Sequence, residues 1–101
     1  MCTIQITEPA KADIQHAFTW WAENHSIDQA TAWYDKIYEA LETLRTMPER
    51  CPVVPEIGLS ETGIRQLLFG IGNRPTHRII FAIGENTITV LRVRHHAQDE
   101  M

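Results

Sequence analysis

The sequence predicts an α+β fold in which a helical hairpin packs on one face of a mostly antiparallel sheet. Apolar residues recur at helical spacing from about residue 8 to residue 47, whereas three alternating, β-branched runs follow at 63–69, 76–83 and 87–94. One short alternating run, at 2–7, precedes the helical region. The order is therefore β-α-α-β-β-β, and helices segregated from most of the strands along the chain are typical of α+β domains.

The strand at 2–7 leads directly into a first helix over about 8–24. Thr7 is a favourable N-cap, because its hydroxyl can accept a hydrogen bond from the first turn, and Pro9 is tolerated where an amide has no helical partner. The predicted buried stripe consists of Ala10, Ile14, Ala17, Phe18 and Trp21. Trp20 lies off this stripe, which favours a position facing solvent or a partner.

A second helix is predicted over about 27–47. Ser26 followed by Gln29 fits a capping box, and Pro48 ends the helix because it pushes the residue before it out of the α conformation. The predicted buried stripe consists of Ala30, Trp33, Ile37, Leu41 and Leu44. The connection between the helices is short, so we expect an antiparallel hairpin. Residues 48–62, which include three prolines, predict a loop.

The last two strands predict a β-hairpin, because Gly84-Glu85-Asn86 separates them and both Gly and Asn tolerate the positive φ of tight turns. Arginines lie on all three of the later strands, at Arg65, Arg78, Arg92 and Arg94. We expect Arg92 and Arg94 to share a face with Ile88 and Val90. Since the helices cover only one face, the other face or its rim is left for arginines and a partner.

A chain of 101 residues with 44% hydrophobic and 22% charged residues predicts a single globular domain over 1–101. The net charge of −4 is unevenly divided. Residues 1–61 carry four basic and ten acidic residues, whereas 62–101 carry five arginines and three acidic residues. An acidic protein attracts nucleic acid weakly. The sequence also has no apolar run of about 20 residues and no signal-peptide pattern, so we expect a cytoplasmic protein without membrane association.

The sequence predicts neither a cofactor nor a metal site. His95 and His96 are adjacent, and adjacent residues of an extended chain point to opposite sides, so they rarely bind one ion. Cys2 and Cys51 are expected to be free thiols, with Cys51 as a small apolar side chain beneath a loop.

The ordered motifs resemble the ParE/RelE superfamily of bacterial toxins, the toxic halves of type II toxin–antitoxin pairs, often called plasmid stabilisation proteins. The matching segments are Ile4-Gln5-Ile6-Thr7-Glu8-Pro9-Ala10-Lys11-Ala12-Asp13-Ile14, Ala40-Leu41 with Leu44 and Met47-Pro48, Gly63-Ile64-Arg65-Gln66-Leu67, His77-Arg78-Ile79-Ile80-Phe81-Ala82-Ile83, and Val90-Leu91-Arg92-Val93-Arg94-His95-His96-Ala97-Gln98-Asp99. The resemblance implies the β-α-α-β-β-β fold, a toxic activity, and a cognate antitoxin from an adjacent gene.

The resemblance implies two alternative activities. RelE-like members cut mRNA in the ribosome, whereas ParE-like members block DNA gyrase by protein contact. RNA cleavage needs a base, an acid and cations, and if this chain is RelE-like we expect those roles to fall to Arg65, Arg78, His95 and His96. The protein is therefore an endoribonuclease on this reading and no enzyme on the ParE-like one.

The ending from Leu91 to Asp99 is closer to the ParE pattern, with Gln98 in place of the usual Arg as a departure. The acidic charge and the lack of a Tyr after His96 count against an RNA-cutting member. We therefore favour a ParE-like gyrase inhibitor, with an RNA-cutting toxin and an inactive or repurposed binding module as alternatives. The expected target-binding residues are Arg78, Arg92, Arg94, His95 and His96. The resemblance leaves a homodimer possible.

Overall fold

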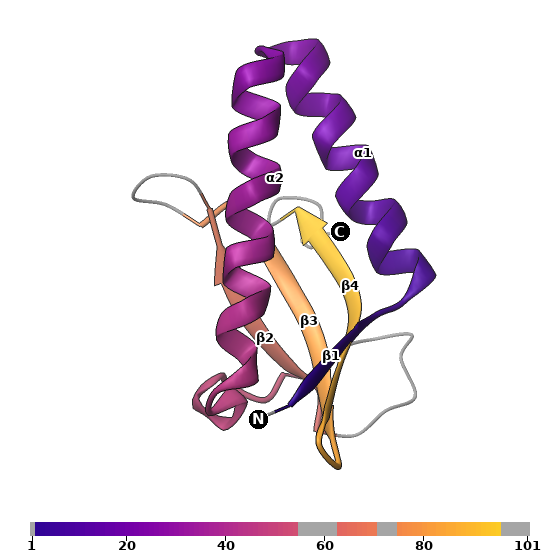
Figure 1. Ribbon diagram of the computed structural model, residues 1–101, viewed down its shortest axis with the longest axis vertical. Helices are drawn as coiled ribbons and strands as arrows, with labels where there is room; N and C mark the ends of the chain where they lie inside the picture. The colour runs from indigo at the N-terminus through magenta and orange to yellow at the C-terminus, as the bar shows by residue number, and fades with distance from the viewer. Residues whose placement is uncertain (1, 55–62, 71–74, 96–101) are drawn as a thin grey trace.

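A computed structural model describes residues 2–54, 63–70 and 75–95, and these form two helices packed on a four-stranded sheet (Figure 1). The elements are β1 (Thr3–Ile6), α1 (Glu8–Asn24), α2 (Ile27–Glu42), β2 (Arg65–Phe69), β3 (His77–Gly84) and β4 (Thr87–His95), with 3₁₀ turns at Thr43–Arg45 and Pro48–Arg50. The predicted order β-α-α-β-β-β and the α+β class are confirmed.

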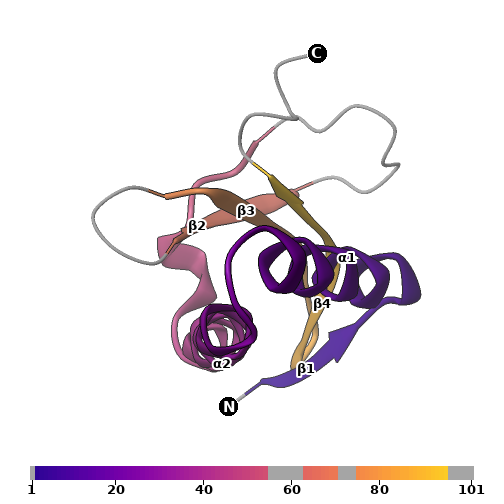
Figure 2. The same ribbon diagram turned by 90° about the horizontal axis from the view of Figure 1, so that it is seen from above.

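The strands are arranged in the order β1-β4-β3-β2. β2, β3 and β4 are antiparallel neighbours, and β1 adds to β4 in parallel, so the sheet is mostly antiparallel as predicted. The β3–β4 turn places Asn86 at a φ of 59°, the left-handed conformation that this residue type tolerates. Seen from above, α1 and α2 lie on the same side of the sheet (Figure 2).

The helices begin at the predicted caps. Thr7 Oγ1 accepts from Ala10 N at 3.2 Å, and Ser26 Oγ accepts from Gln29 N at 3.1 Å. The second predicted stripe packs in the core, and so does the first apart from Phe18, whose ring lies edge-on to Tyr34 of α2. The fully buried members of the two stripes are Ala10, Ile14, Ala30, Trp33, Ile37, Leu41 and Leu44, which pack against Ile79, Phe81, Ile88, Val90 and Val93 of the strands. Trp20 is 51% exposed, in agreement with its position off the stripe.

The end of α2 differs from the prediction. The α-helix ends at Glu42 and a 3₁₀ turn follows, whereas the sequence pattern predicts a helix to residue 47. Met47, which precedes Pro48, lies outside the right-handed α conformation, with φ 52°. Arg50 Nη1 donates to the carbonyls of Thr43, Thr46 and Met47, which satisfies acceptors at the end of this helical region.

The predicted loop after the second helix is partly helical, since Pro48–Arg50 forms a 3₁₀ turn. Cys51 follows this turn, is 4% exposed and packs in the core, as expected. Cys2 and Cys51 are free thiols, as predicted. The part of the loop at 55–62 lies outside the described residues. In the described part of the chain, neither helix has the length and apolar character that crossing a membrane would require.

A β-bulge makes one prediction wrong. Ile80 is opposite Arg92 but Phe81 is opposite Val90, so Leu91 is an extra residue in β4. Because side chains alternate along a strand, the extra residue moves Arg92 and Arg94 to the face opposite Ile88 and Val90. The uninterrupted alternation that we expected would have put all four on one face.

Candidate functional site

Three arginines lie on the sheet face that the helices leave uncovered, and we call Arg78, Arg92 and Arg94 the arginine face. Arg78 and Arg94 are directly opposite each other on β3 and β4, and Arg92 is opposite Ile80. Arg78 Nη1 donates to Gln66 Oε1 of β2 at 2.8 Å. All three arginines are partly exposed. Arg78 and Arg94 of this face suit a planar acidic group of a partner.

Arg92 is also bound within the fold. Its Nε donates to Asp13 Oδ2 at 2.8 Å and its Nη2 donates to Asp13 Oδ1 at 2.9 Å. The Val93 amide donates to the same Asp13 Oδ2 at 2.9 Å. The hydrogen bond to Asp13 raises the pKa of Arg92 above its ordinary value. β1 pairs with β4 only as far as Val90. Beyond that residue, the Asp13 carboxylate of α1 binds Arg92 and Val93 and so stabilises the edge of β4.

Arg65 points to the helix side of the sheet. By register it shares a face with Phe81, whereas Arg78 is opposite Leu68 on the other face. Arg65 Nη1 donates to the carbonyl of Cys51 at 2.6 Å and to that of Glu49 at 3.1 Å. Its guanidinium therefore fastens the turn at Pro48–Arg50 to β2, and the structure does not bring it together with Arg78.

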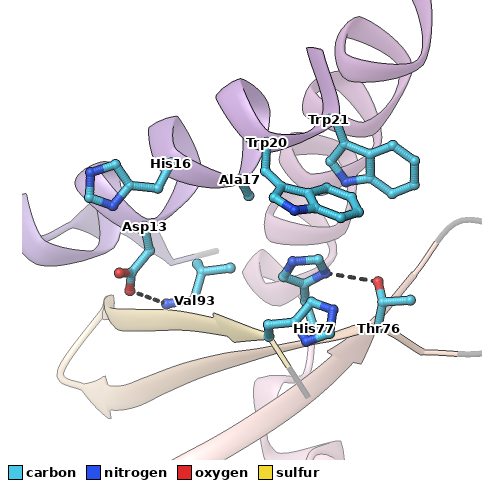
Figure 3. A pocket seen from close by; sticks show the side chains of 9 residues that line it. Asp13, His16, Ala17, Trp20, Trp21, Thr76, His77 and Val93 are labelled. Carbon is cyan, nitrogen blue, oxygen red and sulfur yellow. Dashed lines mark hydrogen bonds between the residues drawn. The ribbon is translucent and has the colours of Figure 1, made fainter. Parts of the chain in front are cut away.

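A cleft of about 600 Å³ lies between α1 and the adjoining ends of β3 and β4 (Figure 3). We call it the α1 cleft, and it is lined by Asp13, His16, Ala17, Trp20, Trp21, Thr76, His77, Val93 and His95. The residues of α1 form one wall, and Thr76 and His77 lie across from them (Figure 3). Such a volume is within the range of ligand and side-chain binding sites.

Two histidines from neighbouring strands meet in the α1 cleft. His77 and His95 are cross-strand partners with ring centroids 5.0 Å apart in an edge-to-face arrangement. His77 is 5% exposed, and its Nδ1 lies 2.8 Å from Thr76 Oγ1. Burial, and secondarily the proximity of His95, lowers the pKa of His77 to about 4. His77 is therefore neutral near pH 7, whereas His95 is exposed.

The predicted site residues are thus divided between two surfaces. Arg78, Arg92 and Arg94 share the arginine face, while His95 belongs to the α1 cleft on the other side of the sheet. His96 lies outside the described residues. Within 2–54, 63–70 and 75–95, no three His, Cys, Asp or Glu side chains gather in a way that could hold a metal ion.

Sequence reasoning gave no role to Asp13 or to the α1 cleft. Asp13 and its partner Arg92 are 79 positions apart, and no local pattern connects them. The sequence placed His77 in the segment that resembles the family, as a departure from the usual Tyr before Arg78, but its burial and its contact with His95 depend on the fold. The exposed position of Trp20 was the one signal of the cleft that the helical periodicity contained.

Comparison with known proteins agrees with the fold and motifs. The family described as "ParE toxin of type II toxin-antitoxin system, parDE" matches residues 4–100. A chain in the structure of the chromosomal ParDE TA system from P. aeruginosa is similar at a TM-score of 0.76 and 19% identity, covering 94% of this chain and 96% of that one. A chain of the YoeB-YefM complex from Staphylococcus aureus is similar at a TM-score of 0.52 and 16% identity, covering 95% of this chain and 98% of that one.

No curated protein matches the sequence. At identities below 20%, the two structural similarities establish a shared fold. The family match is independent of them and spans nearly the whole chain. Together with the motifs from Ile4 to Asp99, it confirms the resemblance that the sequence suggested. The chain belongs to the ParE toxin family of type II toxin–antitoxin systems.

Proposed function

We propose that this protein inhibits DNA gyrase in the cytoplasm by protein–protein contact through the arginine face, and that a cognate antitoxin neutralises it. The main observation behind this proposal is that the candidate nuclease residues lie on opposite faces of the sheet. RNA cleavage through the 2′-hydroxyl needs an acid, a base and phosphate-binding cations around one phosphate. Here Arg65 and His95 are on the helix side of the sheet, and Arg78 is on the other side.

The surroundings of the arginines support the same assignment. Arg65 donates to two backbone carbonyls, and Arg92 is paired with Asp13, so both side chains already serve the fold. Arg78 and Arg94 lie directly opposite each other on the sheet face away from the helices, and both are partly exposed. A pair of planar cations suits carboxylates on a protein surface. The net charge of −4 does not favour docking on the dense phosphate of a ribosome.

Two observations support the RNA-cutting alternative. The similarity to a chain of the YoeB-YefM complex covers most of both chains, and Arg78 and Arg94 could together bind one phosphate. This alternative requires that an acid and a base other than the Arg65–His95 combination come from the same face as Arg78.

Induced expression with and without the adjacent gene tests the proposal. We expect expression alone to stop DNA replication and induce the DNA-damage response while bulk mRNA stays intact. Co-expression of the neighbouring antitoxin should restore growth. Rapid loss of mRNA on translating ribosomes would instead establish the RNA-cutting alternative, and normal growth without the antitoxin would establish an inactive binding module.

A further inference from the structure

We propose that the α1 cleft is an anchor site for the antitoxin, and that it receives a large uncharged apolar side chain flanked by basic residues. This inference rests on the proposed neutralisation by a cognate antitoxin. It assigns a separate binding role to the helix side of the molecule, whereas Arg78 and Arg94 lie on the other face of the sheet.

The rim of the cleft is built from preordered aromatic rings. Trp20 and Trp21 are perpendicular, with centroids 5.5 Å apart, and His25 lies against Trp21 at 4.7 Å and against Trp20 at 5.3 Å. Trp20 is nevertheless 51% exposed. An exposed tryptophan that its neighbours already hold in place loses little conformational entropy on binding, and tryptophan is enriched among residues that dominate interface energies.

The one carboxylate among the residues that line the cleft is already paired. The carboxylate of Asp13 accepts two hydrogen bonds from Arg92 and one from the Val93 amide. His77, across the cleft from α1, is buried and neutral. A cationic side chain would lose hydration in this cleft without gaining an unpaired carboxylate. The apolar surfaces of Trp20, Trp21 and Val93 instead suit an apolar or aromatic side chain.

The charge of the surface around the cleft indicates which antitoxin residues should flank the apolar anchor. The helical hairpin at 8–42 carries seven acidic and two basic residues, and six of the acidic side chains are exposed. Lysine or arginine on either side of the apolar anchor would therefore approach favourably, mainly by raising the association rate. The expected occupant is a basic, amphipathic segment of the antitoxin rather than a second copy of this acidic chain.

The test uses the product of the adjacent gene and synthetic peptides that tile its sequence, with binding to the full-length toxin measured by calorimetry. One tile with an apolar side chain between basic residues is expected to bind wild type. Trp20→Ala should weaken that binding by about tenfold or more, and alanine in place of the apolar side chain of the peptide should do the same. Combining both changes should cost little more than either alone.

Ile27→Ala is the matched control, because Ile27 is an apolar residue of the same hairpin, is 59% exposed and does not line the cleft. It should leave peptide binding unchanged. Equal affinity of wild type and Trp20→Ala for all tiles, with full-length antitoxin still bound, would overturn the anchor site and leave the proposed function intact. Failure of the antitoxin itself to bind would overturn both. Loss of self-association in Trp20→Ala, without loss of peptide binding, would assign the cleft to a second copy and overturn the proposal.

Discussion

At the scale of single residues, the guanidinium groups of Arg65 and Arg92 have different surroundings from those of Arg78 and Arg94. Arg65 donates to the carbonyls of Glu49 and Cys51, and Arg92 donates to both oxygens of Asp13. Arg78 and Arg94 lie opposite each other on β3 and β4, on the sheet face away from the helices, and Arg78 Nη1 also donates to Gln66 Oε1. We therefore expect substitutions of the first pair to affect stability and substitutions of the second pair to affect target binding.

Arg65→Ala should destabilise the protein by about 1–3 kcal/mol, because two carbonyl acceptors of the turn at Pro48–Arg50 lose their charged donor. Urea unfolding followed by circular dichroism measures this change. Folded Arg65→Ala should retain its inhibition of the target. A variant of unchanged stability that has lost toxicity would assign Arg65 to the active surface instead.

Asp13→Ala should lower the free energy of unfolding by about 2 kcal/mol, since it leaves the Val93 amide and the Arg92 guanidinium without their acceptor. Asp13→Asn keeps an acceptor oxygen and should cost less. Glu8→Ala is the control: Glu8 pairs with Lys11 at 3.4 Å on the exposed side of the same helix, and surface pairs of this kind contribute little. Equal effects of Asp13→Ala and Glu8→Ala in thermal or urea unfolding would contradict this role.

His77 predicts an acid-sensitive stability. Its pKa is about 4 in the fold and near 6.5 in the unfolded chain, so between these values the unfolded chain binds more protons. The free energy of unfolding should fall by about 2–3 kcal/mol as the pH drops from 6.5 to 4, and this contribution should be constant above and below that window. His77→Phe should remove it. His16→Phe, which replaces an exposed histidine that lines the same cleft, is the matched control.

Part of this residue-level organisation could be predicted from the sequence. Trp20 was expected to be exposed because it departs from the helical stripe, and Cys51 was expected to be buried. The pair of Asp13 and Arg92 could not be predicted, because its members are far apart in sequence and meet only once β4 lies beside α1. The low pKa of His77 likewise depends on burial that the fold creates.

At the scale of elements, Thr7 connects the start of α1 to the strand on which it packs. Its hydroxyl caps α1 through Ala10 N and lies 2.9 Å from the carbonyl oxygen of Val90 and 3.1 Å from that of Leu91. Its own amide donates to the Val90 carbonyl at 3.1 Å. One residue therefore sets both the first turn of the helix and its position at the bulge in β4.

Thr7→Val should destabilise the protein by about 1–2 kcal/mol, because it retains the shape of threonine but removes the cap and the contact with β4. Thr7→Ser keeps the hydroxyl and should behave nearly as wild type. The comparison is made by chemical unfolding. If Thr7→Ser lost as much stability as Thr7→Val, the methyl group rather than the hydrogen bonds would account for the effect.

The elements could be predicted well where the sequence signals are local. The beginnings of α1 and α2 follow from Thr7 and Ser26, and the β-hairpin follows from Asn86 in its turn. The extra residue at Leu91 left a sequence signal that the prediction did not use. Apolar residues alternate at Ile88 and Val90 and then at Leu91 and Val93, so the alternation shifts by one residue at the bulge. The pairing of β1 with β4 is another long-range feature that the pattern of either strand leaves open.

At the scale of the whole molecule, the sheet separates two surfaces of different character. The helix side combines an acidic hairpin with the aromatic α1 cleft, and the open side carries Arg78 and Arg94. The sequence indicated the charge asymmetry, but the bulge in β4 decides which face holds its arginines. A toxin with this division could contact its target through one side and an antitoxin anchor through the other.

DNA supercoiling by purified gyrase tests the central claim most directly. The purified protein should inhibit supercoiling, Arg94→Ala should weaken inhibition by about tenfold or more, and Lys36→Ala should match wild type because it removes a positive charge from the helix side. Prior addition of the antitoxin should prevent inhibition. Unimpaired supercoiling at saturating protein would contradict the account.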